Sequence, residues 1–339
     1  MNTSTSKPSS HRVAMVISLL VSLAIVVYLF AKLDWGEVWT QLQAVNPWFL
    51  AVLPLGFFVM FYLRALRWRL ILPNREQLSM RALFDATILG FFASTVLPLR
   101  AGEIIRPWLL SRWQPVSFSA SLASILIERL SDAVCMLGLL MLCLTQMNEV
   151  PQLVLVAANA LGGLTGILII VVLISYILPA KTERFFHTCC NLTLGRFSPA
   201  GSSKINEMIT EYFIGVRVIS TPGQLFMVMF YSLLMWLVVA LWYQVLLWGF
   251  GIYPSWWVGM MLNVMIALAV AAPSAPGFVG TFQIGCIVAL STIYGYSKEF
   301  AMAYSMIAHV FQMALIVVAG IVVLQLRGMK FSQLRKTGD

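Results

Sequence analysis

Long apolar stretches constrain the fold of this chain more than any other feature. Several of them hold about 18 or more mostly apolar residues, the length at which a helix crosses the roughly 30 Å hydrocarbon core of a bilayer. Hydrophobic residues make up 60% of the chain and charged residues only 10%, whereas soluble domains carry about 25% charged residues. Transmembrane β-barrels instead alternate over segments of about ten residues, a pattern the sequence lacks. We therefore predict an all-α polytopic membrane protein with about six full transmembrane helices, at residues 13–31, 48–66, 117–147, 152–178, 224–249 and 300–326.

The sequence divides into one membrane domain and two polar ends. Residues 1–12 are polar and are predicted to be a disordered N-terminus. The apolar run that follows lacks the small-residue cleavage site of a signal peptide, so we expect it to be retained as the first helix. Residues 13–327 then form a single transmembrane domain, in which 180–222 is a loop that includes an amphipathic surface helix. Residues 328–339 form a basic tail.

Two apolar regions, 82–113 and 256–294, are interrupted by proline and glycine. The first contains L-P-L-R-A-G-E-I-I-R at 97–106 and the second A-P-S-A-P-G-F-V-G-T-F at 272–282. A helix broken inside a bilayer leaves backbone groups that only protein, water or a ligand can satisfy. Interrupted segments at corresponding positions in two halves of a membrane protein are typical of a transport site.

The distribution of positive charge predicts how these regions cross the membrane. The net charge of +9 would indicate nucleic-acid binding in a soluble protein, but here the positive-inside bias explains it and we expect no nucleic-acid partner. With both termini in the cytoplasm, the basic loops 64–81 and 181–217 and the basic tail also fall inside, provided that each interrupted region returns to the side from which it enters. We therefore predict two oppositely oriented re-entrant helical hairpins, the outline of an inverted repeat.

The few ionisable residues at membrane depth point to a site near the first interrupted region. Each costs roughly 2.5–3.5 kcal/mol in a bilayer, so random scatter is unfavourable. One interpretation makes Arg100 and Arg106 donors to an anionic head group, with carboxylates that orient them or take up protons. The other is a structural ion-pair network that locks the first interrupted region against residues 117–147. The sequence leaves both open for Asp85, Arg100, Glu103, Arg106, Glu128, Arg129 and Asp132, whereas the lone His309 is expected to be structural.

The second interrupted region is uncharged and supplies backbone groups instead. Pro273 and Pro276 end a helix, because proline lacks an N–H donor and clashes with the preceding turn. Gly277 and Gly280 allow close approach of the backbone, and a helix that starts after Pro276 would direct free N–H groups at an anion. A simple packed kink is the alternative.

A basic cluster and the cysteines complete the set of candidate residues. Arg64 and Arg67 are expected to anchor the cytoplasmic interface and attract anionic lipids, or alternatively to be the place where a head group enters. The cysteines lack metal-ligand spacing, so we expect no metal and no cofactor.

These motifs together resemble the lysylphosphatidylglycerol synthase transmembrane region, a flippase-like family. The 97–106 stretch is similar to the family's P-x-R-x-G-E-x-x-R, I-E-R-L-S-D at 127–132 to its E-R-x-x-D, and 272–282 to its P-x-x-P-G-x-x-G, while R-A-L-R-W-R at 64–69 resembles its first basic motif. The resemblance implies a lipid translocase whose functional set is Arg100, Glu103, Arg106, Glu128, Arg129, Asp132, Pro273, Pro276, Gly277 and Gly280.

The function expected from this resemblance is that of a lipid flippase. Its substrate would be an anionic or head-group-modified lipid: a phospholipid, an aminoacyl-phosphatidylglycerol or a polyprenyl-phosphate-linked sugar. The family's bifunctional synthases carry a cytosolic transferase domain that this sequence lacks, so we do not expect an enzyme. The alternatives are an integral membrane enzyme acting on a lipid carrier and a non-transporting partner of a lipid-modifying complex. We expect the bacterial cytoplasmic (inner) membrane, anionic lipids at its cytoplasmic face and an envelope-lipid biosynthesis enzyme as partner.

Overall fold

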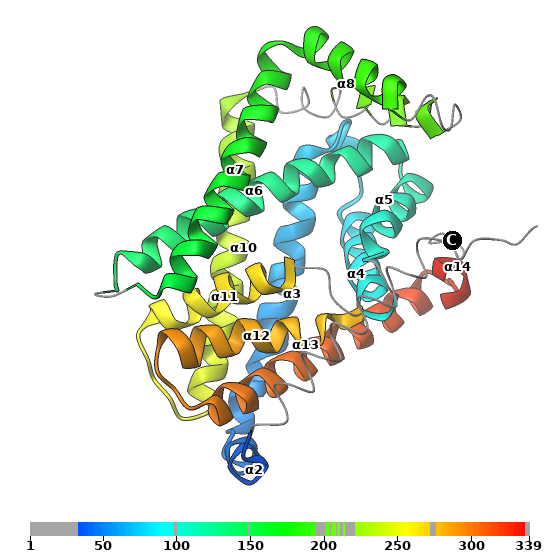
Figure 1. The fold of residues 1–339 in the computed structure, drawn as a ribbon. Helices are drawn as coiled ribbons and strands as arrows, with labels where there is room; N and C mark the ends of the chain where they lie inside the picture. Colours follow the sequence, from blue (N-terminus) through cyan, green and yellow to red (C-terminus); the bar gives the residue numbers. More distant parts are fainter. Residues whose placement is uncertain are drawn as a thin grey trace, which may run out of the picture.

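The computed structural model describes residues 33–97, 100–147, 150–193, 201–203, 205–207, 209–210, 213, 221–271 and 276–335. Regular structure over these ranges is helical throughout (Figure 1). The predicted first crossing at 13–31 lies outside them. The elements are α2 Trp35–Gln43, α3 Pro47–Ile71, η1 Arg75–Gln77, α4 Met80–Val96, α5 Gly102–Trp113, α6 Phe118–Leu144, α7 Gln152–Ile177, α8 Pro179–Thr193, α10 Pro222–Gly249, α11 Trp256–Ala271, η2 Pro276–Phe278, α12 Thr281–Ile287, the π-helix η3 Val288–Ile293, α13 Lys298–Leu326 and α14 Phe331–Arg335.

Four of the described helices are long and apolar enough to cross a membrane. They are α3, α10 and α13 over their whole lengths, and α7 over Val154–Val171. Each matches one of the predicted crossings. The 27-residue α6 occupies the predicted crossing at 117–147, but its three charged residues keep it outside the group of four. These four helices are candidates for four of the six predicted crossings, and the total of about six transmembrane helices stays a prediction.

Helix starts follow local capping chemistry. Asn46 caps α3 through its side chain and Pro47 occupies the first turn, where the missing N–H of proline costs nothing. Thr221 and Pro222 repeat this arrangement at the start of α10, and Ser297 caps α13 by accepting from the N–H of Phe300 at 3.1 Å. These caps fix where the long helices begin.

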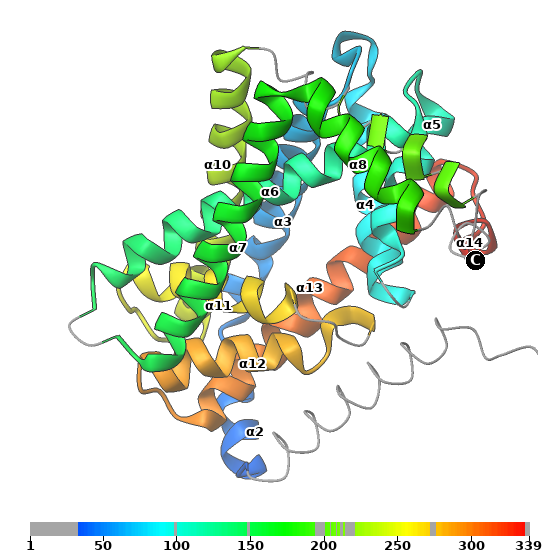
Figure 2. The same cartoon turned by 45° about the horizontal axis from the view of Figure 1, so that its top comes forward.

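Both interrupted regions form pairs of packed helices. In the first interrupted pair, α4 packs against α5, and in the second interrupted pair, α11 packs against α12. The two pairs lie on different sides of α3 (Figures 1 and 2), and α13 contacts both α4 and α12. The loop predicted at 180–222 begins with a helix, α8. Of the amphipathic helix expected near 204–213, the described residues 205–207, 209–210 and 213 are helical.

Most of the described interior belongs to two large apolar cores that meet along α13 and α10, beside a small third cluster of Ile71, Ile127 and Val228. One core gathers α11, α12 and the first half of α13, including Phe300 and Tyr304. The other gathers α3, α4, α5 and the last part of α13, including Ile316 and Val323. Trp236 and Val239 of α10 pack against both cores. The junction between the cores therefore lies between the two interrupted pairs.

Candidate functional site

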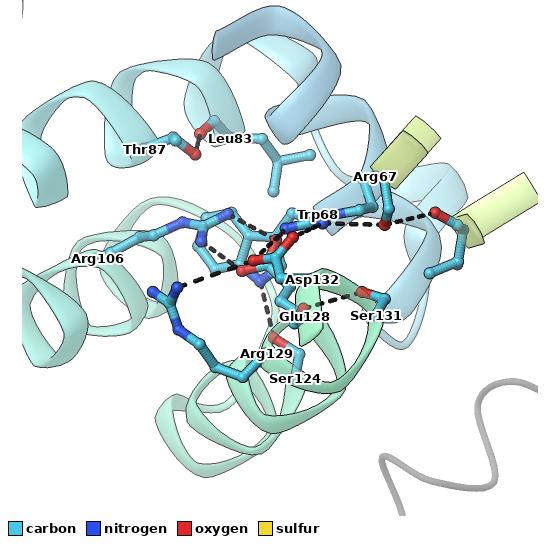
Figure 3. Close-up of polar contacts among 12 residues, drawn as sticks. Arg67, Trp68, Leu83, Thr87, Arg106, Ser124, Glu128, Arg129, Ser131 and Asp132 are labelled. Atoms are coloured by element: carbon cyan, nitrogen blue, oxygen red, sulfur yellow. Dashed lines mark hydrogen bonds and ion pairs between the residues drawn. The ribbon is translucent and has the colours of Figure 1, made fainter. Parts of the chain in front are cut away.

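Arg67 lies at the centre of a buried ion-pair network. Its guanidinium is fully buried, pairs with Asp132 of α6, and donates to the Ser232 hydroxyl of α10 at 2.9 Å. Glu128 lies 3.5 Å from a second nitrogen of the same group, and the Trp236 indole donates to Asp132 at 3.0 Å. These contacts join α3, α6 and α10, and Figure 3 shows the arginines converging on the two carboxylates.

Arg106 anchors α5 to α6 through the same network. Its two terminal nitrogens donate to Glu128 at 2.6 and 3.3 Å, and both side chains are buried. The guanidinium also lies over the Trp68 ring at 3.7 Å, and the Trp68 indole donates to the Ser124 hydroxyl at 2.7 Å. Bidentate pairing with Glu128 and stacking on Trp68 therefore hold the Arg106 guanidinium within the helix bundle.

Glu103 and Arg129 form a second, more open pair. Arg129 donates to Glu103 at 3.0 Å, and the two side chains are 48% and 39% exposed. Arg129 also lies 3.8 Å from Asp132, so it links the open pair to the buried network. Because water competes with such an exposed ion pair, the Glu103 and Arg129 side chains can change partners more easily than the buried pairs can.

Arg100 connects the first interrupted pair to the second. It adopts a left-handed backbone conformation with φ of 53°, unusual for a residue other than glycine. Its side chain donates to the Val270 carbonyl near the end of α11 and lies over the Phe278 ring at 5.5 Å. A cation at a helix C-terminus is favoured by the helix dipole.

The turn of the second interrupted pair is held by hydrogen bonds to His309 of α13. His309 Nε2 donates to the Gly277 carbonyl at 2.7 Å, and Nδ1 accepts from the Gln283 amide at 3.1 Å. Gln283 in turn accepts from the N–H of Gly280 at 2.8 Å, and the imidazole stacks on Phe282 with ring centres 4.5 Å apart. His309 is therefore a satisfied structural residue, as expected.

The predicted N–H donors after Pro276 are arranged differently from expectation. Residues 276–278 form a short 3₁₀ turn with positive φ at Gly277 and Phe278, and α12 begins only at Thr281. Gly280, with φ of 89°, precedes it. The expected helix start directly after Pro276 is wrong because positive φ values interrupt the helix there. Pro273 lies outside the described residues.

A cavity of about 330 Å³ lies where the interrupted pairs and the two cores meet. The two turns approach each other, since η2 contacts α4 and a Cβ added at Gly277 would lie 3.5 Å from the Thr95 carbonyl. Four arginines and one carboxylate line the cavity beside a wall of mostly aromatic and aliphatic side chains. The charged lining residues are Arg64, Arg100, Arg106, Arg129 and Glu103.

Arg64 differs from the other buried cations of this network. It is 6% exposed and contacts Phe91 and Trp236 through ring faces at 4.7 and 6.0 Å. Its Nε has no hydrogen-bond partner, a feature it shares with Arg67 and Arg106. Across the described ranges, no carboxylate lies within ion-pair distance of it. The expectation that Arg64 and Arg67 anchor a membrane interface is wrong, because both are buried inside the helix bundle.

Asp85 does not belong to the predicted charge cluster. Arg327, at the end of α13, contacts its carboxylate at 2.6 and 2.7 Å, and Arg81 lies 3.9 Å away. Removing Asp85 and adding Arg64 and Arg67 reverses the balance of the cluster, from one excess acid to two excess cations. Sequence reasoning also missed Trp68 and Trp236. Trp68 stands between Arg67 and Arg69, which was its only signal, whereas Trp236 lies in an apolar run that carries none.

Over the part of the chain that the structure describes, no group of three or more His, Cys, Asp or Glu side chains could hold a metal ion.

Comparison with known proteins identifies the family. The family model of the lysylphosphatidylglycerol synthase transmembrane region matches residues 15–320. A curated relative from Haloferax volcanii, named glycosyltransferase AglD, is 23% identical over 342 residues, which cover 92% of this chain and 54% of the relative. The chain thus spans about half the length of the curated relative it matches, and no solved structure matches it. The chain therefore belongs to the lysylphosphatidylglycerol synthase transmembrane region family.

Proposed function

We propose that this protein is a lipid flippase that moves an anionic or head-group-modified lipid between leaflets through the central cavity. One observation carries the proposal: a cavity between two interrupted helix pairs combines arginines with apolar walls. A lipid combines a charged head group with apolar chains, so it matches both parts of this lining. Family membership adds support, because this family is defined by the membrane part of a lipid-modifying protein.

The lining of the cavity supports an amphipathic ligand. Phe57, Phe61, Phe91 and Ile316 form part of its apolar wall, and burial of acyl chains against such a wall is worth roughly 25 cal/mol per Å². Arginines match phosphate oxygens through their forked donors. Under this proposal, the two interrupted pairs are re-entrant hairpins of opposite orientation, and their relative movement exposes the cavity to one leaflet at a time.

The membrane setting follows from the same proposal. The proposed membrane is the bacterial inner membrane, and the positive-inside bias supports an orientation with both termini in the cytoplasm. There the protein meets anionic lipids at the cytoplasmic face and the enzymes that make envelope lipids. It performs no covalent chemistry itself, and the lipid is its ligand.

The proposal is tested by reconstitution into vesicles with labelled lipids and a readout of the outer leaflet. Wild-type protein is expected to accelerate translocation above protein-free vesicles, and Arg106→Ala with Glu128→Ala is expected to abolish this gain. Arg112→Gln is the matched control, because Arg112 is exposed and lies outside the cavity. Unchanged translocation in the folded double variant overturns the assigned site, and no acceleration by wild-type protein with any lipid overturns the flippase.

An integral membrane enzyme acting on a lipid carrier is the second candidate. The name of the curated relative, a glycosyltransferase, favours it. Incubation of the reconstituted protein with a lipid-linked sugar donor and an acceptor, followed by mass spectrometry, distinguishes the two. A new glycosylated product supports the enzyme, whereas unmodified lipid that changes leaflet supports the flippase.

A further inference from the structure

We infer that the cavity takes a lipid whose head group ends in a phosphate monoester and carries no ammonium group. This inference rests on the proposed lipid site and narrows its substrate class. It is drawn from the balance of charge around the cavity and, within the residues that the structure describes, from one buried arginine without an acidic partner at ion-pair distance and from a lining without a free carboxylate.

The charge cluster holds two more cations than anions. Each acid has an arginine partner: Asp132 pairs with Arg67, Glu128 with Arg106, and Glu103 with Arg129. Two arginines that line the cavity then remain without a carboxylate over the described ranges. These two are Arg64 and Arg100.

The uncompensated cation on Arg64 is costly in the absence of a ligand. A buried charge is normally paired, because its transfer out of water is strongly unfavourable. Arg64 contacts ring faces, and Asp132 and Glu128 act on it only from beyond ion-pair distance, since each is paired with another arginine. It is nevertheless 6% exposed and lines the cavity. A bound anion supplies the missing partner. Arg100 differs in donating to the Val270 carbonyl, a neutral acceptor that an anion can replace.

Two uncompensated cations match a phosphate monoester. Such a group carries a charge of about −1.5 to −2 near neutral pH and presents three strong acceptor oxygens. Guanidinium groups bind phosphate oxygens through paired N–H donors. A phosphodiester, with a single negative charge, leaves one of the two cations uncompensated.

A head group that carries an ammonium is disfavoured by the same lining. Glu103 is the only acid among the described residues that line the cavity, and Arg129 already occupies it. Glu128 and Asp132 lie behind the lining and are bound by Arg106 and Arg67. An aminoacylated phospholipid would thus place its ammonium among arginines without a free carboxylate.

The apolar wall favours a lipid over a water-soluble phosphate. Phe57, Phe61 and Phe91 stand beside Arg64 in the lining. A short phosphate ester satisfies the arginines but leaves this wall in contact with water. A lipid gains both interactions, so it is expected to bind more tightly than glycerol 3-phosphate.

Direct binding to the purified full-length protein in detergent tests this inference separately from transport. Native mass spectrometry compares phosphatidic acid, phosphatidylglycerol, lysyl-phosphatidylglycerol and glycerol 3-phosphate. We expect phosphatidic acid to bind at least about tenfold more tightly than the other three. Equal or stronger binding of lysyl-phosphatidylglycerol overturns the inference, and so does a folded protein that binds no phosphatidic acid.

The role of Arg64 is tested by substitution. Arg64→Gln is expected to weaken phosphatidic acid binding about tenfold or more, and Arg64→Lys to recover part of the loss, because it keeps the charge without the fork. Arg112→Gln should bind like wild type. Arg64→Gln should also raise the thermal stability of the lipid-free protein, because a buried uncompensated charge is removed. A loss of lipid-free stability in Arg64→Gln, with unchanged lipid binding, shows a structural arginine and overturns the assignment.

The binding measurement and the vesicle transport assay together distinguish the inferred phosphate site from the proposed flippase activity. Selective binding without translocation in vesicles supports the phosphate site and overturns the flippase. Translocation of phosphatidylglycerol or lysyl-phosphatidylglycerol at the rate of phosphatidic acid supports the flippase and overturns the phosphate monoester.

Discussion

Replacement of Glu128 by glutamine tests the buried ion-pair network with almost no change in side-chain volume. Glu128 accepts two hydrogen bonds from Arg106, at 2.6 and 3.3 Å, and lies 3.5 Å from Arg67. The substitution removes one of the three carboxylates, Glu103, Glu128 and Asp132, that pair with arginines of the cluster. Arg106 then keeps a neutral hydrogen-bond acceptor in a buried site but loses its counter-charge.

The expected cost follows from burial. Removal of one partner from a buried ion pair destabilises proteins by about 3–5 kcal/mol. Glu103→Gln is the matched control, because it makes the same chemical change in the same cluster. Its pair with Arg129 is 39–48% exposed, and exposed pairs contribute less than about 1 kcal/mol. We therefore expect Glu128→Gln to lower the free energy of unfolding by at least about 2 kcal/mol more than Glu103→Gln.

Denaturant titration of the purified protein in one fixed detergent measures both variants. A double variant, Arg106→Gln with Glu128→Gln, is expected to lose less stability than the two single losses together, because neither buried charge is then left alone. The reasoning is refuted if Glu128→Gln stays within about 1 kcal/mol of wild type, or if it costs no more than Glu103→Gln.

Two further predictions concern the contact of α4 with α5 and the C-terminal end of α13. Gly102→Ala would place a Cβ 1.7 Å from the Gly90 carbonyl oxygen, so overpacking should cost about 1–3 kcal/mol or more in the same titration. Gly138→Ala, where nothing lies within 4 Å, should be neutral or stabilising, and an equally neutral Gly102→Ala contradicts the close contact of α4 with α5. Asp85→Asn should release Arg327 and speed hydrogen exchange at the C-terminal end of α13, whereas unchanged exchange there shows that the pair does not hold this end.

Much of the architecture could be predicted from local sequence. Apolar runs located α3, α7, α10 and α13, because length and hydropathy determine which helices can cross a membrane. Proline and glycine located both interruptions, since they act on the backbone within a few residues. The ion-pair network was one of the two interpretations that the sequence left open, and Glu128 and Asp132, four residues apart on α6, share the face on which it forms.

Long-range partners could not be predicted. Asp85 pairs with Arg327, which is 242 residues away, so nothing near Asp85 in the sequence distinguishes it from the cluster acids. The burial of Arg64 and Arg67 was missed for a similar reason, because a basic run at a helix end is typical of an interface. Only the packing of α3 against α10, with α4 and α6 beside it, places these arginines inside.

Thiol labelling inside the cavity tests most directly whether lipid crosses through it. Gln312 lines the cavity, whereas Gln325 is exposed on the same helix and lies outside it. Each is replaced by cysteine in protein that carries Cys189→Ser, because Cys189 alone among the five cysteines is not buried. After reaction with a bulky charged thiol reagent in vesicles, Gln312→Cys should lose its translocation activity and Gln325→Cys should keep it. Undiminished translocation by fully labelled Gln312→Cys would contradict transport through this cavity.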